Sequence, residues 1–100
     1  MHLSIRPTVQ LHEASKGSWH YCVLSAAATA ELLRFRGPKP RTRHTKARIT
    51  IGDTTWQTNL IPDKDRGWLF VIKAVVRSAE GIEPGRRVAA TVELLNDGVR

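Results

Sequence analysis

The sequence contains one cysteine, Cys22, and no long apolar run. A single cysteine cannot form a disulfide within the chain, which agrees with a reducing compartment. No apolar stretch approaches the roughly 20 residues that a helix needs to cross a bilayer, and the first ten residues are too short and too polar for a signal peptide. We therefore expect a cytoplasmic protein with no membrane partner.

Groups that bind metals or act as nucleophiles are also few. The four histidines, His2, His12, His20 and His44, are scattered, and no Cys/His pair has the spacing of a zinc site. His20 and Cys22 lie two positions apart on an expected strand, so their side chains would share a face. A Cys-His nucleophile would also need an orienting group, an oxyanion donor and a pocket, and the sequence indicates none of them. We predict no enzyme activity, no metal and no cofactor.

Alternating apolar and polar residues are the main structural signal in this chain of 100 residues, a length typical of one small domain (1–100). They predict strands around 8–12, 19–23, 47–51, 54–60, 68–72 and 88–94, with Val9 and Leu11 on one side of the first. The Trp side chains at 19, 56 and 68 fall at alternating positions, which is typical of core residues. If one were exposed, it could instead stack on a base or cap a ligand pocket.

Two short helices are expected between these strands. Ser25 is a good N-cap for the alanine-rich segment that follows, whose Leu32 and Leu33 would dock on the sheet, and the helix should fade by Gly37. A second helix of about two turns begins near residue 73, carries Val75, Val76 and Ala79 on its apolar side, and stops at Gly81. The predicted fold is therefore mainly β with two short helices.

The chain also resembles itself at an offset of 49 positions. This shift places Trp19 on Trp68, Tyr21 on Phe70 and Val23 on Ile72. Each copy reads as two strands, a short helix and a further strand, which predicts two β-β-α-β halves at about 5–51 and 54–95. Two such halves could interlock about a pseudo-twofold axis into a closed or nearly closed barrel without exposed strand edges.

Several sequence runs between about Thr8 and Leu95 carry a resemblance to a known family. They are Trp19-x-Tyr21-x-Val23, the pair 49–52 and 56–62, Gly67-Trp68-Leu69, and the runs 71–77 and 81–85. On these the chain resembles an uncharacterised bacterial family of small barrel domains of unknown function, sometimes joined to OmdA-like bacteriocin-protection domains. The resemblance implies a double-split β-barrel akin to the AbrB and MazE type of DNA-binding barrels, with no established catalytic residues. The chain departs from the family pattern at Val23-Leu24-Ser25 and in its unusually basic loop before Ile49.

The excess positive charge is concentrated in one segment, residues 34–48, which contains no acidic residue. The net charge is +7, and outside this segment nine basic residues balance nine acidic ones. Such a segment attracts nucleic acid or other polyanions, and arginine can bind phosphate with a rigid fork of donors. The candidate phosphate contacts are Arg34, Arg36, Lys39, Arg41, Arg43, Lys46 and Arg48.

Two non-catalytic function classes follow from these observations, and a third class is an enzyme that would use His20 and Cys22. The first is a non-catalytic binding domain whose basic loop contacts nucleic acid or another polyanion, without strong sequence specificity because no base-reading helix is evident. The second is a β-barrel module that binds a protein or a small ligand and has no nucleic-acid role, in which the charge only aids solubility or the loop is simply solvated. Either could be a monomer or a homodimer.

Overall fold

The structure, a computed structural model, describes residues 1–40 and 42–95. The described strands are β1 (His2–Ile5), β2 (Gln10–Ala14), β3 (Gly17–Val23), β4 (Thr45–Ile51), β5 (Thr54–Asp63), β6 (Gly67–Ile72) and β7 (Ala90–Leu94). The described helices are α1 (Ala26–Arg36), which follows β3, and α2 (Ala74–Glu80), which follows β6.

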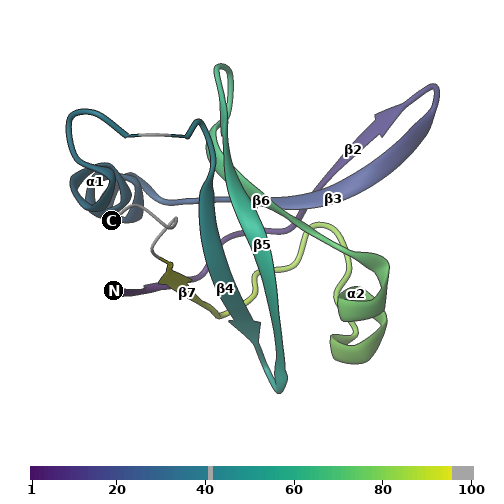
Figure 1. Ribbon diagram of the computed structural model, residues 1–100. Coiled ribbons are helices and arrows are strands. Elements are labelled where there is room, and N and C mark those ends of the chain that lie inside the picture. The colour runs from purple at the N-terminus through teal and green to yellow at the C-terminus, as the bar shows by residue number, and fades with distance from the viewer. Residues whose placement is uncertain (41, 96–100) are drawn as a thin grey trace.

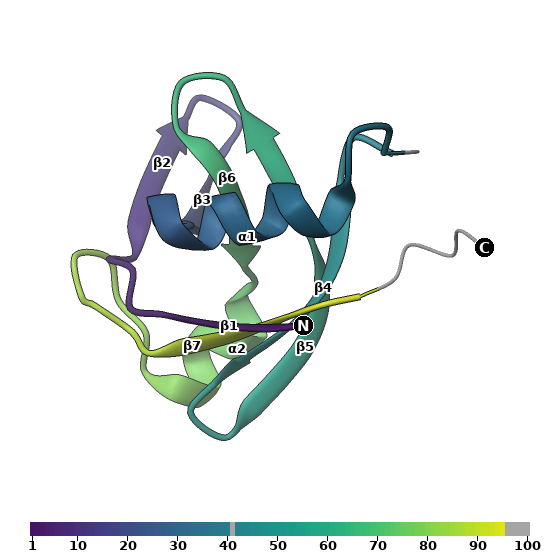
Figure 2. The ribbon, with the colours of Figure 1, turned by 90° about the vertical axis from the view of Figure 1, so that its left-hand side faces the viewer.

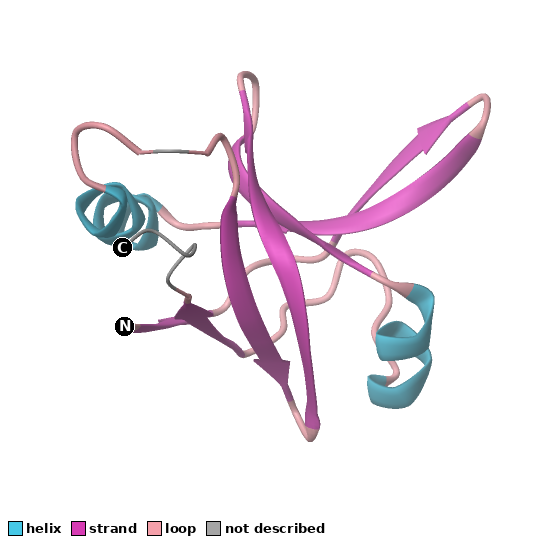
Figure 3. Ribbon diagram, viewed as in Figure 1, coloured by secondary structure: helices cyan, strands magenta, loops and turns pink. Residues whose placement is uncertain are grey.

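Within residues 1–40 and 42–95, seven strands form one antiparallel sheet in the order β1-β7-β4-β5-β6-β3-β2 (Figures 1 and 3). Strand β5 connects the two parts of the sheet, because it pairs with β4 over Thr54–Leu60 and with β6 over Ile61–Asp63. This arrangement confirms the predicted mainly β fold with two short helices. The edge strands β1 and β2 do not pair with each other in the described chain, so the sheet is not closed and a closed barrel is not confirmed.

The two edges of the sheet are joined by residues 6–9, a connection that the sequence pattern did not reveal. These residues form backbone hydrogen bonds with the segment before β7. The Val9 N–H donates to Arg86 O at 2.8 Å, and the Val9 carbonyl oxygen accepts from the Gly85 N–H at 2.8 Å. The chain therefore changes its pairing partner from β7 at β1 to β3 at β2. Strand β1 was not predicted. Because of this change of partner, Val9 is 1% exposed and Leu11 is 37% exposed, although their spacing had placed them on one side of a single strand.

The core lies on the inner face of the sheet, which α1 crosses in Figure 2. The large apolar side chains that the helices add to this core are Leu32 of α1 and Val76 of α2. In α1 the predicted docking of Leu32 is confirmed, but Leu33 is 50% exposed. In α2 Val76 is buried and Val75 is 65% exposed. Successive residues of a helix are about 100° apart, so neighbours cannot both face the sheet. No helix in the described part of the chain is long and apolar enough to cross a membrane.

The tryptophans divide between the core and the surface. Trp56 is buried and packs edge-on against Phe70, with ring centroids 6.3 Å apart. Trp68 is half-buried and packs against the same core. Trp19 is also half-buried, but it lies on the β2-β3 hairpin, which projects from the body of the molecule in Figure 1. The prediction of core tryptophans therefore holds for two of the three.

The β4-β5 turn is held by the last residue of α2. Gly52 has φ 60° and begins a two-residue turn in which Ile51 pairs with Thr54. The Glu80 carboxylate accepts hydrogen bonds from the amide of Asp53 at 3.2 Å and from the Thr54 hydroxyl at 2.6 Å. A Cβ at residue 52 would lie 2.1 Å from Glu80 Oε1. Only glycine therefore fits both the turn and this carboxylate.

We expect Gly52→Ala to destabilise the fold by about 2 kcal/mol in urea unfolding, because it imposes a positive φ on alanine and displaces the Glu80 carboxylate. Glu80→Ala is the matched partner in a double-mutant cycle. In the Glu80→Ala background the glycine substitution should cost about 1 kcal/mol less, since the carboxylate is already gone. Strictly additive costs would contradict the assigned contact.

Candidate functional site

The basic segment spans three structural elements. Arg34 and Arg36 lie in the last turn of α1, Lys39 and Arg43 lie in the loop at 37–44, and Lys46 lies on β4. Arg48 lies two residues further along β4. Arg36 is half-buried, and the other five of these residues are exposed. The seventh predicted contact, Arg41, lies outside the described residues. The structure therefore spreads the predicted set over a helix end, a loop and a strand.

Two of the arginines are already paired with carboxylates. Arg34 Nη1 lies 2.7 Å from Glu31 Oε2, one helical turn away, and Arg48 Nη1 lies 2.7 Å from Glu93 Oε1 on β7. The hydrogen bond from Arg48 lowers the pKa of Glu93 below its ordinary value, so the carboxylate stays ionised beside the guanidinium. Their charge is locally compensated, and these two residues attract a phosphate less than the sequence alone suggested.

Arg36 holds the loop in place. Its Nη1 donates to His44 O at 3.2 Å and to Thr45 Oγ1 at 2.5 Å, and its Nη2 donates to Thr42 O. The guanidinium carbon also lies 4.9 Å from the ring centroid of Trp68, in a cation-π contact. A guanidinium engaged in this way anchors the loop to the start of β4 and has fewer donors left for a phosphate than the sequence alone suggested.

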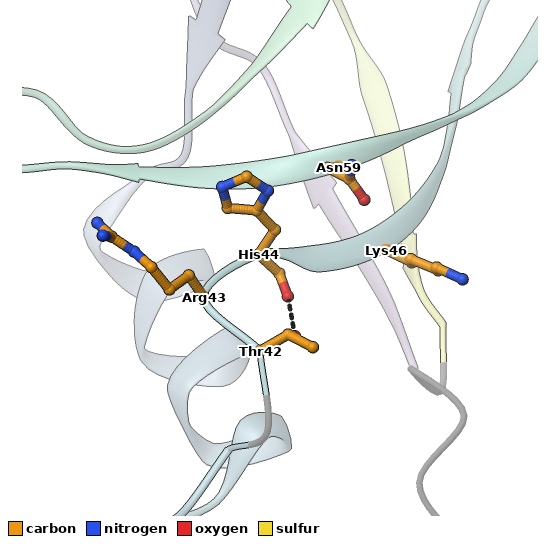
Figure 4. A pocket seen from close by; sticks show the side chains of 5 residues that line it. All are labelled: Thr42, Arg43, His44, Lys46 and Asn59. Atoms are coloured by element: carbon orange, nitrogen blue, oxygen red, sulfur yellow. Dashed lines mark hydrogen bonds between the residues drawn. The ribbon is translucent and has the colours of Figure 1, made fainter.

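A pocket of about 450 Å³ lies where this loop meets the sheet (Figure 4). It is lined by Thr42, Arg43, His44, Lys46 and Asn59. The first three come from the loop, Lys46 from β4, and Asn59 from β5, where it is the cross-strand partner of Lys46. In Figure 4 the side chains of Arg43 and Lys46 extend to opposite sides, with the His44 ring between them. The Thr42 hydroxyl donates to His44 O at 2.6 Å and is therefore part of the loop's own framework.

The chemistry of this pocket suits an anion. Among the described residues that line it, none carries a carboxylate. Lys39, Arg43 and Lys46 form no ion pair with a carboxylate in the part of the chain that the structure describes. Lys46 faces outward because its neighbours along β4, Thr45 and Ala47, are buried. Lysine, arginine and an amide group in one pocket can donate several hydrogen bonds to a phosphate.

Sequence reasoning missed three residues of this pocket, Thr42, His44 and Asn59. The first two lie within the basic segment, and their hydrogen-bonding side chains are visible in the sequence. Asn59 is thirteen positions from Lys46 in the chain and reaches the pocket only through the β4-β5 register. Cross-strand pairing of the predicted hairpin could have found it.

His20 and Cys22, considered above as a Cys-His nucleophile, both lie on β3. Cys22 is fully buried opposite Phe70, and burial raises the pKa of its thiol to about 12, so the thiolate nucleophile is strongly disfavoured. Burial and the nearby charge of Arg77 lower the pKa of His20. Its Nδ1 is buried without a hydrogen-bond partner among the described residues. Within the same residues, no group of three or more His, Cys, Asp or Glu side chains is arranged to hold a metal ion.

Comparison with known proteins identifies one family model. It is described as domain of unknown function (DUF1905), and it matches residues 8–92 of the chain. Comparisons with curated proteins and with solved structures found no match. The matched residues cover β2 to β7 apart from the last part of β7, and they include the whole basic segment and the pocket described above. The chain belongs to the DUF1905 family.

Proposed function

We propose that this protein is a non-catalytic binding domain that holds phosphate groups of a nucleic acid, or of another polyanion, in the pocket between the 37–44 loop and β4. The observation that carries the proposal is the lining of the pocket: Arg43, His44 and Lys46 line it with Asn59, and none of the described lining residues carries a carboxylate. A cytoplasmic location, as a monomer or a homodimer, is part of the proposal.

The basic residues divide into three roles. Lys39, Arg43 and Lys46 are the direct phosphate contacts, since no carboxylate pairs with them in the described chain. Arg36 is a positioning residue, because its hydrogen bonds fix the carbonyls of Thr42 and His44. Arg34 and Arg48, each paired with a glutamate, contribute long-range attraction only. Arg41 belongs to the same segment and remains a predicted contact.

Recognition at this site should depend on backbone phosphates more than on base sequence. Arg43 and Lys46 extend to opposite sides of the pocket, which suits two phosphates of one strand better than a single small anion (Figure 4). The basic side chains come from the last turn of α1, a loop and β4, and not from the length of one helix. Contacts of this kind position a nucleic acid and do not read its sequence.

We also infer that the sheet is a double-split β-barrel in its topology. Two observations support this inference. After β1, the element order β-β-α-β occurs twice. The equivalent strands of the two halves pair with each other, β3 with β6 and β4 with β7, both antiparallel, as a pseudo-twofold axis between the halves requires.

The second candidate function is a protein-interaction or small-ligand module without a nucleic-acid role. The exposed apolar side chains of α1 favour it, because Leu33 is 50% and Phe35 is 38% exposed on the same short helix. In this case the pocket would hold an acidic side chain of a partner, and the charge would mainly aid solubility.

The proposed function is tested by Arg43→Ser combined with Lys46→Ser. At about 100 mM salt we expect this variant to bind labelled DNA and RNA roughly tenfold or more weakly, because two phosphate contacts are lost. The slope of log affinity against log salt should become shallower by about 1.8 on duplex DNA and about 1.4 on single strands. Fluorescence anisotropy over a salt series measures both quantities.

The matched control removes the same charge elsewhere, with Lys73→Ser and Arg86→Ser, two exposed residues on either side of α2. This control should keep the wild-type slope to within about 0.5 if the contacts are local. Equal losses of affinity in both variants would indicate attraction by net charge alone and would overturn the assignment of the pocket as the phosphate site. Absence of binding by the wild type even at low salt would eliminate the nucleic-acid function.

The non-catalytic assignment of Cys22 has its own test. At pH 8.5, we expect iodoacetamide to alkylate Cys22 in the native protein more than about a hundredfold more slowly than in urea, because the unfolded thiol has an ordinary pKa and no longer resists ionisation. Mass spectrometry of quenched samples gives both rates. Native and unfolded rates within about tenfold of each other would show an accessible thiolate and reopen the question of catalysis.

A further inference from the structure

The outer face of the sheet contains buried apolar side chains that do not belong to the core. Tyr21 is 8% exposed and Leu69 is 2% exposed, yet neither is part of the core cluster of the described residues. Each is adjacent in sequence to a core residue, Cys22 and Phe70 respectively. Because successive side chains of a strand point to opposite faces, Tyr21 and Leu69 point away from the core. The sheet therefore has a second, outward-facing apolar cluster.

Cross-strand pairing surrounds these two residues with further apolar side chains. Tyr21 lies opposite Val71, and Leu69 lies between Val23 on β3 and Ile61 on β5. All three neighbours are half-buried. Tyr21 and Leu69 are thus the buried centre of this cluster, and the half-buried valine and isoleucine side chains around them are the part that a ligand can contact.

Aromatic side chains extend this surface along the β2-β3 hairpin. His12 and Trp19 are cross-strand partners with ring centroids 5.0 Å apart, and the Trp19 and Tyr21 rings are 5.1 Å apart. Both pairs are tilted by 48°. Trp19 and His12 are half-buried, so each retains accessible ring surface. The three rings form a continuous row on one side of the hairpin.

Arg66, in the β5-β6 turn, contacts the first and the last ring of this row, His12 and Tyr21. Its Nε donates to Tyr21 Oη at 2.9 Å, its guanidinium lies 5.3 Å from the Tyr21 ring centroid, and its Nη2 lies 3.3 Å from His12 Nδ1. The guanidinium of Arg66 is held in turn by Asp63, whose Oδ2 lies 3.1 Å from Arg66 Nη1. Hydrogen bonds to Arg66 and the adjacent backbone amides lower the pKa of Asp63, with the amides of residues 65 and 66 as the largest causes. The aromatic row is therefore ordered before any ligand binds.

The aromatic surface and the basic pocket are parts of one sheet face. Asn59, which lines the pocket, and Ile61, which lies against Leu69, are two residues apart on β5 and so share a face. On this face, Ile61 on β5 and Val23 on β3 lie on either side of β6, two strand spacings or roughly 10 Å apart. A flexible chain can lie across both regions without leaving this face.

We propose that this face binds single-stranded nucleic acid, with phosphates at Arg43 and Lys46 and with unpaired bases stacked on Trp19. The inference rests on the proposed function and narrows its ligand class. Single-strand binding proteins combine a basic region with aromatic rings, each of which stacks on a base whatever its sequence. A duplex can use the pocket but not the rings, because its bases are already stacked inside the helix.

The test compares labelled oligothymidylate and oligouridylate of about 20 nucleotides with a duplex of the same length, a size that exceeds the usual single-strand binding site. We expect Trp19→Ala to weaken binding of the single strands by about tenfold or more and to change duplex binding by less than about twofold. Trp19→Phe, which keeps a stacking ring, should recover most of the lost affinity. Val75→Ala, an exposed apolar residue of α2, is the matched control and should bind as the wild type does.

The outcomes separate the inference from the proposed function. Unchanged single-strand affinity of Trp19→Ala, with weaker binding by the pocket variant Arg43→Ser/Lys46→Ser, would overturn the stacking inference and leave the phosphate site standing. Equal losses on single strands and duplex would also overturn it, because stacking is specific to unpaired bases. If the wild type binds none of the three probes, both the stacking inference and the nucleic-acid form of the proposed function fail. Thermal unfolding of each variant shows whether it is folded. If Trp19→Ala is unfolded, the single-strand affinity of Trp19→Phe decides the stacking inference.

Discussion

The antiparallel pairing of β4 with two neighbours is the constraint on which the rest of the structure depends. Strand β4 bonds to β5 on one side and to β7 on the other, so its register is fixed from both edges. Every second side chain from Thr45 to Ile51 is buried, and a slip of one residue would bury Lys46 and Arg48 instead. The burial of isoleucine on the inside therefore positions the basic residues on the outside.

The fold gives the members of the basic segment different environments. Carboxylates on α1 and β7 compensate Arg34 and Arg48, and Arg36 is used to join the end of α1 to the loop. What remains directed to solvent is the group around Arg43 and Lys46, in a pocket that contains a β5 amide. The high positive charge of the sequence is thus reduced to a small set of side chains in a defined arrangement, which continues across the sheet into the aromatic surface.

The sequence predicted those features that depend on local patterns. Alternation located most strands, Ser25 caps α1 through a 3.1 Å bond to the Ala28 amide, and Gly81 ends α2 in the left-handed conformation. Features that depend on distant parts of the chain were missed. The break between β1 and β2 is set by backbone bonds to residues 85–88, and the pairing of Arg48 with Glu93 joins residues 45 positions apart. The Arg36 contacts were missed because their acceptors are mainly backbone carbonyls, which no side-chain pattern reveals.

The central claim is that one face of the sheet, from the 37–44 loop to the β2-β3 hairpin, binds a nucleic-acid strand. The most direct measurement is a two-dimensional amide NMR titration of the protein with an unlabelled single-stranded oligonucleotide. The account predicts that shifts concentrate at Arg43, Lys46, Asn59 and the indole N–H of Trp19, while α2 and β1 stay unchanged. Shifts concentrated on α2 and β1, or none at saturating oligonucleotide, would contradict it.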